Sequence, residues 1–206
     1  MSECDFERFF MSITQIKSKP TYGHISLNPL ARKHVFIGSG TGSEAIMRCL
    51  KEGHASHVII LLETTDKLLI DRFKQNAPSH SLHFCHETND LLYHLKNILE
   101  ACYMGTQIYI AGPEIFIWTV TQMTKQYGLS KEEIQQELCG SSARKVFCVH
   151  CKIIIQAVTS NVIQCHCCTH FLMVRDHFSR HLGAYIGVRV DAEVPGDIPM
   201  VEEAFL

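Results

Sequence analysis

Residues 33–50 of the chain read KHVFIGSGTGSEAIMRCL, and this stretch decides the fold of the first part of the molecule. A short apolar run with β-branched residues, His34–Ile37, leads into a glycine-rich turn and then into a helical pattern over Ser43–Leu50. Glycines permit a tight turn, and the start of a helix presents free N–H groups with a partial positive charge. The stretch is therefore typical of a strand–turn–helix unit that can hold a phosphate group.

The same alternation of strand and helix patterns continues along the chain. Further strands are predicted at His57–Leu62, Ser81–Cys85 and Gln107–Ala111, and further helices at Asp66–Gln75, Asn89–Tyr103, Pro113–Tyr127 and, after a capping-box start, Lys131–Leu138. Such alternation implies an α/β fold with a doubly wound parallel sheet, covered by helices on both faces. We predict this domain over residues 31–140, after an N-terminal extension over residues 1–30 in which only Asp5–Thr14 hints at a helix or a strand.

Ligands of open α/β sheets bind at the carboxyl ends of the strands, where this sequence places its glycines and an acid. Glu63 closes the second strand, where a carboxylate can bind a ribose hydroxyl and would favour NADH over NADPH by repelling a 2′-phosphate. The candidate cofactor-binding residues are Gly38, Gly40, Thr41, Gly42, Ser43, Glu63, Gly112 and Pro113, with Glu114 beside them. The alternative is that these residues only form tight turns between strands and helices.

Residues 33–140 resemble the NAD(P)-binding lobe of the ferredoxin–NADP reductase and phthalate dioxygenase reductase family, through GTG at 40–42, AGPE at 111–114 and IQQE at 134–137. The resemblance implies a nucleotide lobe that follows a flavin-binding barrel. Ala111 stands where that family usually has a cysteine beside the nicotinamide, which favours a vestigial lobe. The residues before Lys33 are too few for the barrel, and no Arg-x-Tyr-Ser flavin motif occurs, so we expect that the chain is not a complete reductase.

Residues 148–168 read CVHCKIIIQAVTSNVIQCHCC and decide the fold of the second part. Each CxxC is a tight turn that directs two thiolates at one point, so we predict one tetrahedral metal site with the ligands Cys148, Cys151, Cys165 and Cys168. Lys152–Ile163 is predicted to be a β-hairpin between the two turns. The result is a zinc-ribbon or rubredoxin-like domain over residues 144–182, followed by a tail over residues 183–206.

The ligand set leaves the metal open between zinc and a single iron. Zinc would stabilise a domain too small to fold well alone, whereas iron in the same cage would relay one electron. Cys167 breaks the repeated spacing and is predicted to be spare. We expect His150, His166 and His170 to flank the site without binding the metal.

After the second CxxC turn, residues 176–197 read DHFSRHLGAYIGVRVDAEVPGD. This segment is similar to the C-terminal segment of the DmmA-type small subunits of dimethylamine monooxygenase, in which it also follows a pair of CxxC turns. The resemblance implies the oxidation of dimethylamine by O2 and NAD(P)H to methylamine and formaldehyde. It also implies partner subunits, one with haem and one with flavin and an iron–sulfur cluster. We therefore expect a non-haem subunit that docks these partners, possesses no catalytic residues and is inactive alone.

Composition restricts the remaining function classes. The formal net charge of −2 argues against nucleic acid or an anionic membrane as the partner. The start lacks the pattern of a secretory signal, and no run is apolar enough to span a membrane, so a cytoplasmic protein is expected. Two alternatives to the monooxygenase subunit are open. One is a zinc-stabilised assembly protein without a redox role, and the other is a free-standing NAD(P)-binding protein.

Overall fold

The computed structural model describes residues 18–53, 55–77 and 79–206, which form two compact units. The α/β unit comprises residues 22–144 with 205–206, and the ribbon unit comprises residues 145–204 with the described residues before 22. The hint of an element at Asp5–Thr14 lies outside the described residues. No helix in the described ranges is long and apolar enough to cross a membrane.

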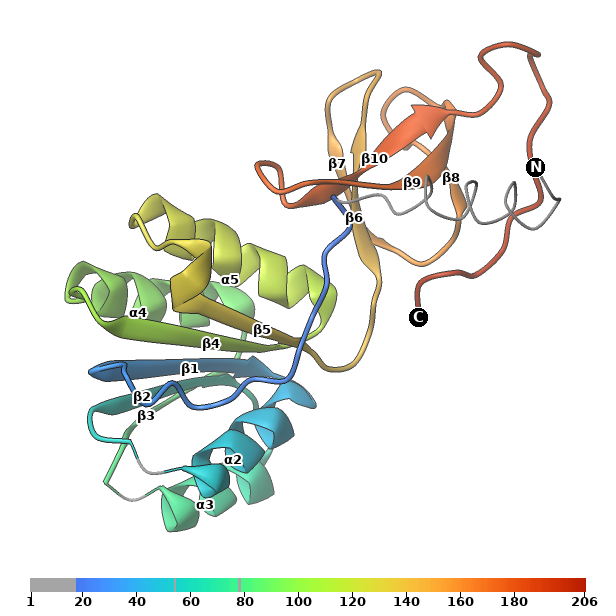
Figure 1. Cartoon of the computed structure of the whole chain (residues 1–206). Coiled ribbons are helices and arrows are strands. Elements are labelled where there is room, and N and C mark those ends of the chain that lie inside the picture. The colour runs from blue at the N-terminus through green and yellow to red at the C-terminus, as the bar shows by residue number, and fades with distance from the viewer. Residues whose placement is uncertain (1–17, 54, 78) are drawn as a thin grey trace, which may run out of the picture. The chain divides into compact units, whose positions relative to one another are not determined.

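The α/β unit contains a sheet of five parallel strands in the order β3-β2-β1-β4-β5 (Figure 1). Its elements are β1 (Lys33–Ser39), α2 (Gly42–Glu52), β2 (Val58–Glu63), α3 (Lys67–Asn76), β3 (Ser81–Cys85), α4 (Thr88–Glu100), β4 (Thr106–Gly112), α5 (Glu114–Gln126), a 3-10 turn η1 (Lys131–Glu133) and β5 (Ile134–Leu138). The predicted doubly wound parallel sheet is confirmed. The strand order reverses between β1 and β4, which is where such folds bind ligands.

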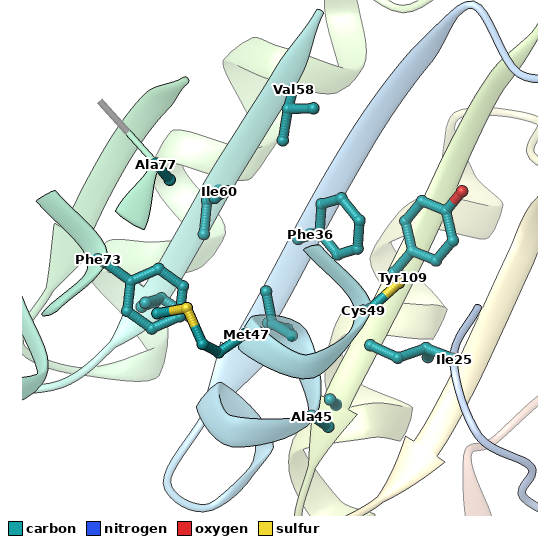
Figure 2. Packing of buried hydrophobic residues seen from close by; sticks show 13 residues of the cluster. Ile25, Phe36, Ala45, Met47, Cys49, Val58, Ile60, Phe73, Ala77 and Tyr109 are labelled. Carbon is teal, nitrogen blue, oxygen red and sulfur yellow. The ribbon is translucent and has the colours of Figure 1, made fainter. Parts of the chain in front are cut away.

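The sheet has a separate apolar layer on each face. One layer packs α2 and α3 on the sheet, and Figure 2 shows the stacked rings of Phe36 and Tyr109, whose centroids are 4.3 Å apart, at its centre. The other layer packs α4 and α5 on the opposite face, with Val35, Ile37 and Ile108 fully buried. These near-continuous apolar strands are what a parallel sheet covered on both faces requires.

The last strand corrects one prediction. Lys131–Leu138 was predicted to be a helix, but only the capping box and one 3-10 turn form, and Ile134–Leu138 is strand β5. The open edge of β4 accounts for this result, because β5 pairs with it in parallel over Ile108–Gly112. Tertiary pairing thus overrides the helix propensity of the Gln and Glu residues.

Part of the predicted N-terminal extension also belongs to the α/β unit. Ile25 is 1% exposed and lies in the layer beside α2. The segment is anchored by β5, since the Ile25 N–H donates to Glu137 Oε2 at 2.8 Å and the Gly23 N–H donates to the Gln136 carbonyl. The unit therefore begins near residue 22, before the predicted boundary at residue 31.

The ribbon unit has a second sheet of five strands in the order β7-β6-β10-β9-β8. The strands are β6 (Arg144–Cys148), β7 (Ile154–Val158), β8 (Val162–Gln164), β9 (Phe171–Ser179) and β10 (Ala184–Arg189). β10 lies at the centre of this sheet, between β6 and β9, so the sheet continues past the predicted ribbon end at residue 182. The rings of Phe178 and Tyr185 meet edge to face at 4.9 Å and anchor this pair of strands.

The predicted hairpin over Lys152–Ile163 is wrong. β7 and β8 lie at opposite edges of the sheet, because β7 neighbours β6 and β8 pairs with β9. The cysteine turns themselves join the neighbouring strands, so the segment between them links two hairpins and is not one hairpin. Near the end of the chain, the Ala204 N–H donates to the Thr159 carbonyl, and Glu203 forms an antiparallel bridge with Ser160.

Candidate functional site

The two cysteine turns have the same backbone geometry. In the first, the Cys148 N–H donates to the Ile153 carbonyl and the Lys152 N–H donates to the Cys148 carbonyl, both at 2.9 Å. In the second, the Cys165 N–H donates to the His170 carbonyl and the Thr169 N–H donates to the Cys165 carbonyl, also at 2.9 Å. The residue after each turn has a positive φ, 67° at Lys152 and 61° at Thr169. The turns are thus two copies of one ligand-presenting loop.

The four predicted sulfurs converge. Cys148 Sγ lies 3.7 Å from Cys168 Sγ, and Cys151 Sγ lies 3.6 Å from Cys165 Sγ. All four sulfurs lie within 4.8 Å of one another. Four ligands at the usual zinc–sulfur distance of about 2.3 Å stand about 3.8 Å apart at the corners of a tetrahedron. The donor set and its spacing therefore fit one tetrahedral metal ion.

Thiolate is the form of cysteine that binds metal, and the surroundings of the sulfurs differ in whether they favour it. Burial by itself raises the pKa of the Cys165 thiol, but the backbone N–H groups of Cys168 and Cys167 and the neighbouring thiols outweigh it and lower the pKa to about 6. The backbone N–H of His170 likewise lowers the pKa of Cys168, but burial and the neighbouring thiols outweigh it and raise that pKa to about 12. Such N–H···S bonds hold the negative charge that four thiolates would bring together.

The apolar core around the sulfurs is small. Cys148, Cys165 and Leu172 are fully buried, and a few isoleucines pack against them. Cys167 is exposed and lies outside the sulfur cluster, as its spacing predicts. Among the histidines, the rings of His150 and His170 meet edge to face at 4.3 Å. The groups that could hold a metal among the described residues include none of the predicted flanking histidines.

The glycine turn lies at the point where the strand order reverses, beside the end of β4. A side chain at Gly42 would overlap the carbonyl of Ala111, so α2 begins in close contact with β4. Gly40 has a φ of +54°, a left-handed value that favours glycine, and a side chain at this position would meet no other atom within 4 Å. The N–H groups of Ser43 and Glu44 donate to the carbonyls of Gly40 and Thr41. Two N–H groups at the start of α2 are therefore already hydrogen-bonded within the turn and are less available to bind an anion.

Two candidate oxygens differ in their partners. Glu63 ends β2 as predicted, and its carboxylate accepts a hydrogen bond from Thr88 Oγ1 at 3.0 Å. The Ser43 hydroxyl is buried and has no hydrogen-bond partner among the residues that the structure describes. A buried hydroxyl without a partner costs free energy, which a bound phosphate oxygen would offset. Ser43 is thus the one observation that favours an anion at the turn.

The segment after β5 crosses the same edge of the sheet. The Cys139 N–H donates to the Gly112 carbonyl at 2.9 Å, and the Glu114 N–H donates to the Ser141 carbonyl at 3.1 Å. Between them, Gly140 lies near Thr41 Oγ1 and Pro113. The carboxylate of Glu114 is buried and accepts the hydroxyl of Tyr22 at 2.6 Å. Residues 139–141 therefore pack directly against the end of β4 and the start of α5.

Sequence reasoning missed one cluster of chemically active side chains. Cys85, Asp90 and His94 meet at the end of β3 and the start of α4. A signal was present in the sequence, because a cysteine closing a strand is followed by an acid and a histidine at helical spacing. The missed network at β5 is structural: Glu137 accepts Arg48 at 2.6 Å and His24 at 3.0 Å.

Comparisons with known proteins cover most of the chain. The family model "Dimethylamine monooxygenase subunit DmmA-like, N-terminal domain" matches residues 14–134, and the C-terminal domain model of the same family matches residues 145–188. The delta subunit of the haem-dependent oxidative N-demethylase of Ectopseudomonas mendocina (strain ymp) is 29% identical over 181 residues, which cover 86% of this chain and 91% of that protein.

Solved structures with a similar fold share little sequence with the chain. The siderophore-interacting protein of Acinetobacter baumannii matches 58% of this chain and 52% of its own, with 21% identity and a TM-score of 0.46. The flavohaem-like FAD/NAD-binding domain of nitric oxide dioxygenase from Vibrio cholerae matches 59% of this chain and 56% of its own, with 18% identity and a TM-score of 0.42. The chain thus covers about half of each of those two chains. Because the DmmA-like models match both the α/β unit and the ribbon, the chain belongs to the DmmA-like family of dimethylamine monooxygenase subunits.

Proposed function

We propose that the chain is the small, non-haem subunit of a haem-dependent N-demethylase that acts on dimethylamine. The reaction converts dimethylamine, O2, NAD(P)H and a proton into methylamine, formaldehyde, water and NAD(P)+. A haem subunit would perform the oxygen chemistry, and a flavin and iron–sulfur subunit would supply the electrons. The observation that carries the proposal is the family match across both units, and the relative named as a delta subunit supports it.

The role assigned to this chain is docking of the two partner subunits. Among the residues that the structure describes, the cysteine cluster comprises four thiols, which would complete a tetrahedral shell and leave no position for a substrate, and residues 139–141 and Tyr22 are hydrogen-bonded to residues at the end of β4 and the start of α5. Both features suit a positioning role better than a catalytic one. A tag on this chain should co-purify a haem-containing and a flavin-containing subunit from the native host, detected by a Soret band and by flavin absorption. Recovery of the chain alone, under conditions that preserve other complexes of the host, would sink the docking role.

For the cysteine cluster we propose zinc, held by Cys148, Cys151, Cys165 and Cys168. The small core around the sulfurs supports this choice, because small domains with little core are often stabilised by a structural metal or by disulfides. When bound, zinc would fix the two cysteine turns to each other without any redox change. A single iron, which would make the ribbon an electron relay, is the alternative. Elemental analysis with an absorption spectrum separates them, since ferric thiolate absorbs visible light and zinc does not.

For the glycine turn we propose a vestigial nucleotide lobe. The crossing segment 139–141, the engaged N–H groups of the first turn of α2 and the alanine at position 111 support this reading. Calorimetric titration of the free subunit and of the whole complex with NADH tests it. Heat of binding in the complex that disappears in Gly40→Val would show that the turn holds NADH, and the unpartnered Ser43 hydroxyl would then have its ligand.

A further inference from the structure

Cys85, Asp90 and His94 form a second cluster of potential metal ligands, within the α/β unit. One ligand atom from each residue lies within 4.8 Å of the other two. Cys85 is the last residue of β3 and is 1% exposed, whereas the side chains of Asp90 and His94 on α4 are each 42% exposed. All three residues come from the short segment 85–94, so folding of β3 and α4 is enough to bring them together.

The distances within the cluster resemble those between ligands of one metal ion. His94 Nε2 lies 3.7 Å from Asp90 Oδ1, which is too long for a hydrogen bond. Nitrogen and oxygen ligands at about 2.0–2.2 Å from zinc would stand about 3.3–3.6 Å apart in a tetrahedron. The Cys85 sulfur lies within 4.8 Å of the ligand atoms of both Asp90 and His94. A metal ion that replaces the thiol proton would bind both groups.

The surroundings leave one side of the cluster open. Cys85 packs against Leu91 and Leu95 in the apolar layer under α4, which closes the protein side. The exposed halves of Asp90 and His94 leave the other side accessible to solvent. Glu63 is the parallel partner of Cys85 on β2, so a second carboxylate adds negative charge beside the thiol. This charge would attract a cation.

A neighbouring histidine, His83, lies beside the exposed ligand His94. The rings of His83 and His94 are 5.7 Å apart, and His83 Nε2 is hydrogen-bonded to Ser81 Oγ at 3.0 Å. His83 contributes no ligand atom to the group of three. It therefore offers a matched control, because it lies beside His94 and belongs to the same sheet edge.

We propose that Cys85, Asp90 and His94 bind a divalent transition-metal ion, of which zinc is the best match to one thiolate, one imidazole and one carboxylate. Three protein ligands leave a fourth position for water or a small ligand, unlike the closed site of four cysteines. The site stands at the carboxyl edge of β3, next to Glu63. It is independent of the docking role proposed above.

The test is metal stoichiometry of the full chain, dialysed against a zinc buffer of about 1 μM free ion and analysed by elemental analysis with a protein assay. The wild type is expected to hold two zinc ions per chain. His94→Ala and Cys85→Ala are expected to hold one, with affinity for the second ion reduced more than about a hundredfold, because losing a ligand costs more than losing a group that supports one. His83→Ala is expected to keep both ions.

Folding is checked separately by far-ultraviolet circular dichroism, since Cys85 is buried and its substitution affects packing. His94 is half exposed, so His94→Ala tests the site without that complication. One ion per wild-type chain, or two ions retained in a folded His94→Ala, overturns the proposal. Equal loss in His83→Ala and His94→Ala also overturns it, because that result would indicate nonspecific binding to surface histidines.

Discussion

Replacing Cys165 with serine removes one of the four converging sulfurs of the ribbon unit. Cys165 is fully buried, and its sulfur lies 3.6 Å from that of Cys151. Structural zinc sites with thiolate ligands contribute about 10–16 kcal/mol, or about 2.5–4 kcal/mol for each of four ligands. At about 1.4 kcal/mol for each factor of ten, the loss of one ligand should weaken zinc binding by about a hundred- to a thousandfold.

The assay is competition for zinc between the full chain and a chromophoric chelator. Cys167→Ser is the matched control, because Cys167 lies in the same turn but is exposed and outside the sulfur cluster. We expect Cys165→Ser to release zinc at a chelator concentration at which the wild type and Cys167→Ser retain it. If Cys167→Ser loses the metal and Cys165→Ser keeps it, the ligand assignment is wrong.

Three further predictions concern the isolated chain. Purified alone, it should show neither a flavin spectrum nor a Soret band and should oxidise neither NADPH nor dimethylamine. A flavin spectrum, a Soret band or either activity in the isolated chain would contradict the docking role. Gly42→Ala should lower the free energy of unfolding in urea by about 1–3 kcal/mol, because the added carbon would overlap the Ala111 carbonyl. Gly40→Ala should lower it by only about 1–2 kcal/mol, because the sole cost there is the positive φ. If both substitutions lowered it equally and by more than these amounts, the close packing of Gly42 on Ala111 would not be what distinguishes the two positions. Burial alone raises the pKa of Glu137, but hydrogen bonds from Arg48, the Ile25 N–H and His24 outweigh it, so the folded pKa is below the unfolded value near 4.5. The stabilisation from this carboxylate is therefore complete above the unfolded pKa and is lost as pH falls through the folded pKa. Glu137→Gln should flatten this acid dependence of the thermal unfolding temperature.

Some elements could be predicted because the residues that determine them are close together in the sequence. The buried strands are continuous apolar runs such as His34–Ile37, and α3 begins where the side chain of Asp66 accepts the N–H groups of Leu68 and Leu69. The convergence of the four sulfurs followed from spacing alone, because a CxxC turn fixes the direction of both its thiolates. These features depend on few contacts between distant residues.

Other elements depended on long-range partners that no local pattern reveals. Ile134–Leu138 becomes a strand only because β4 offers an open edge, and Glu137 then meets Arg48 of α2 across the sheet. The pairing of β7 with β6, and not with β8, is decided by the whole second sheet. The cluster of Cys85, Asp90 and His94 was visible as a spacing, but its convergence required the geometry between β3 and α4.

The most direct test of the central claim is formaldehyde release from dimethylamine by the complex purified through this chain, compared with the same partner subunits freed of it. With O2 and NAD(P)H present, the account predicts formaldehyde formation by the complex, its loss when this chain is removed, and its return when the metal-loaded wild-type chain is added back. Full activity of the partners without this chain, or no dimethylamine-dependent formaldehyde in the complex, would contradict the account.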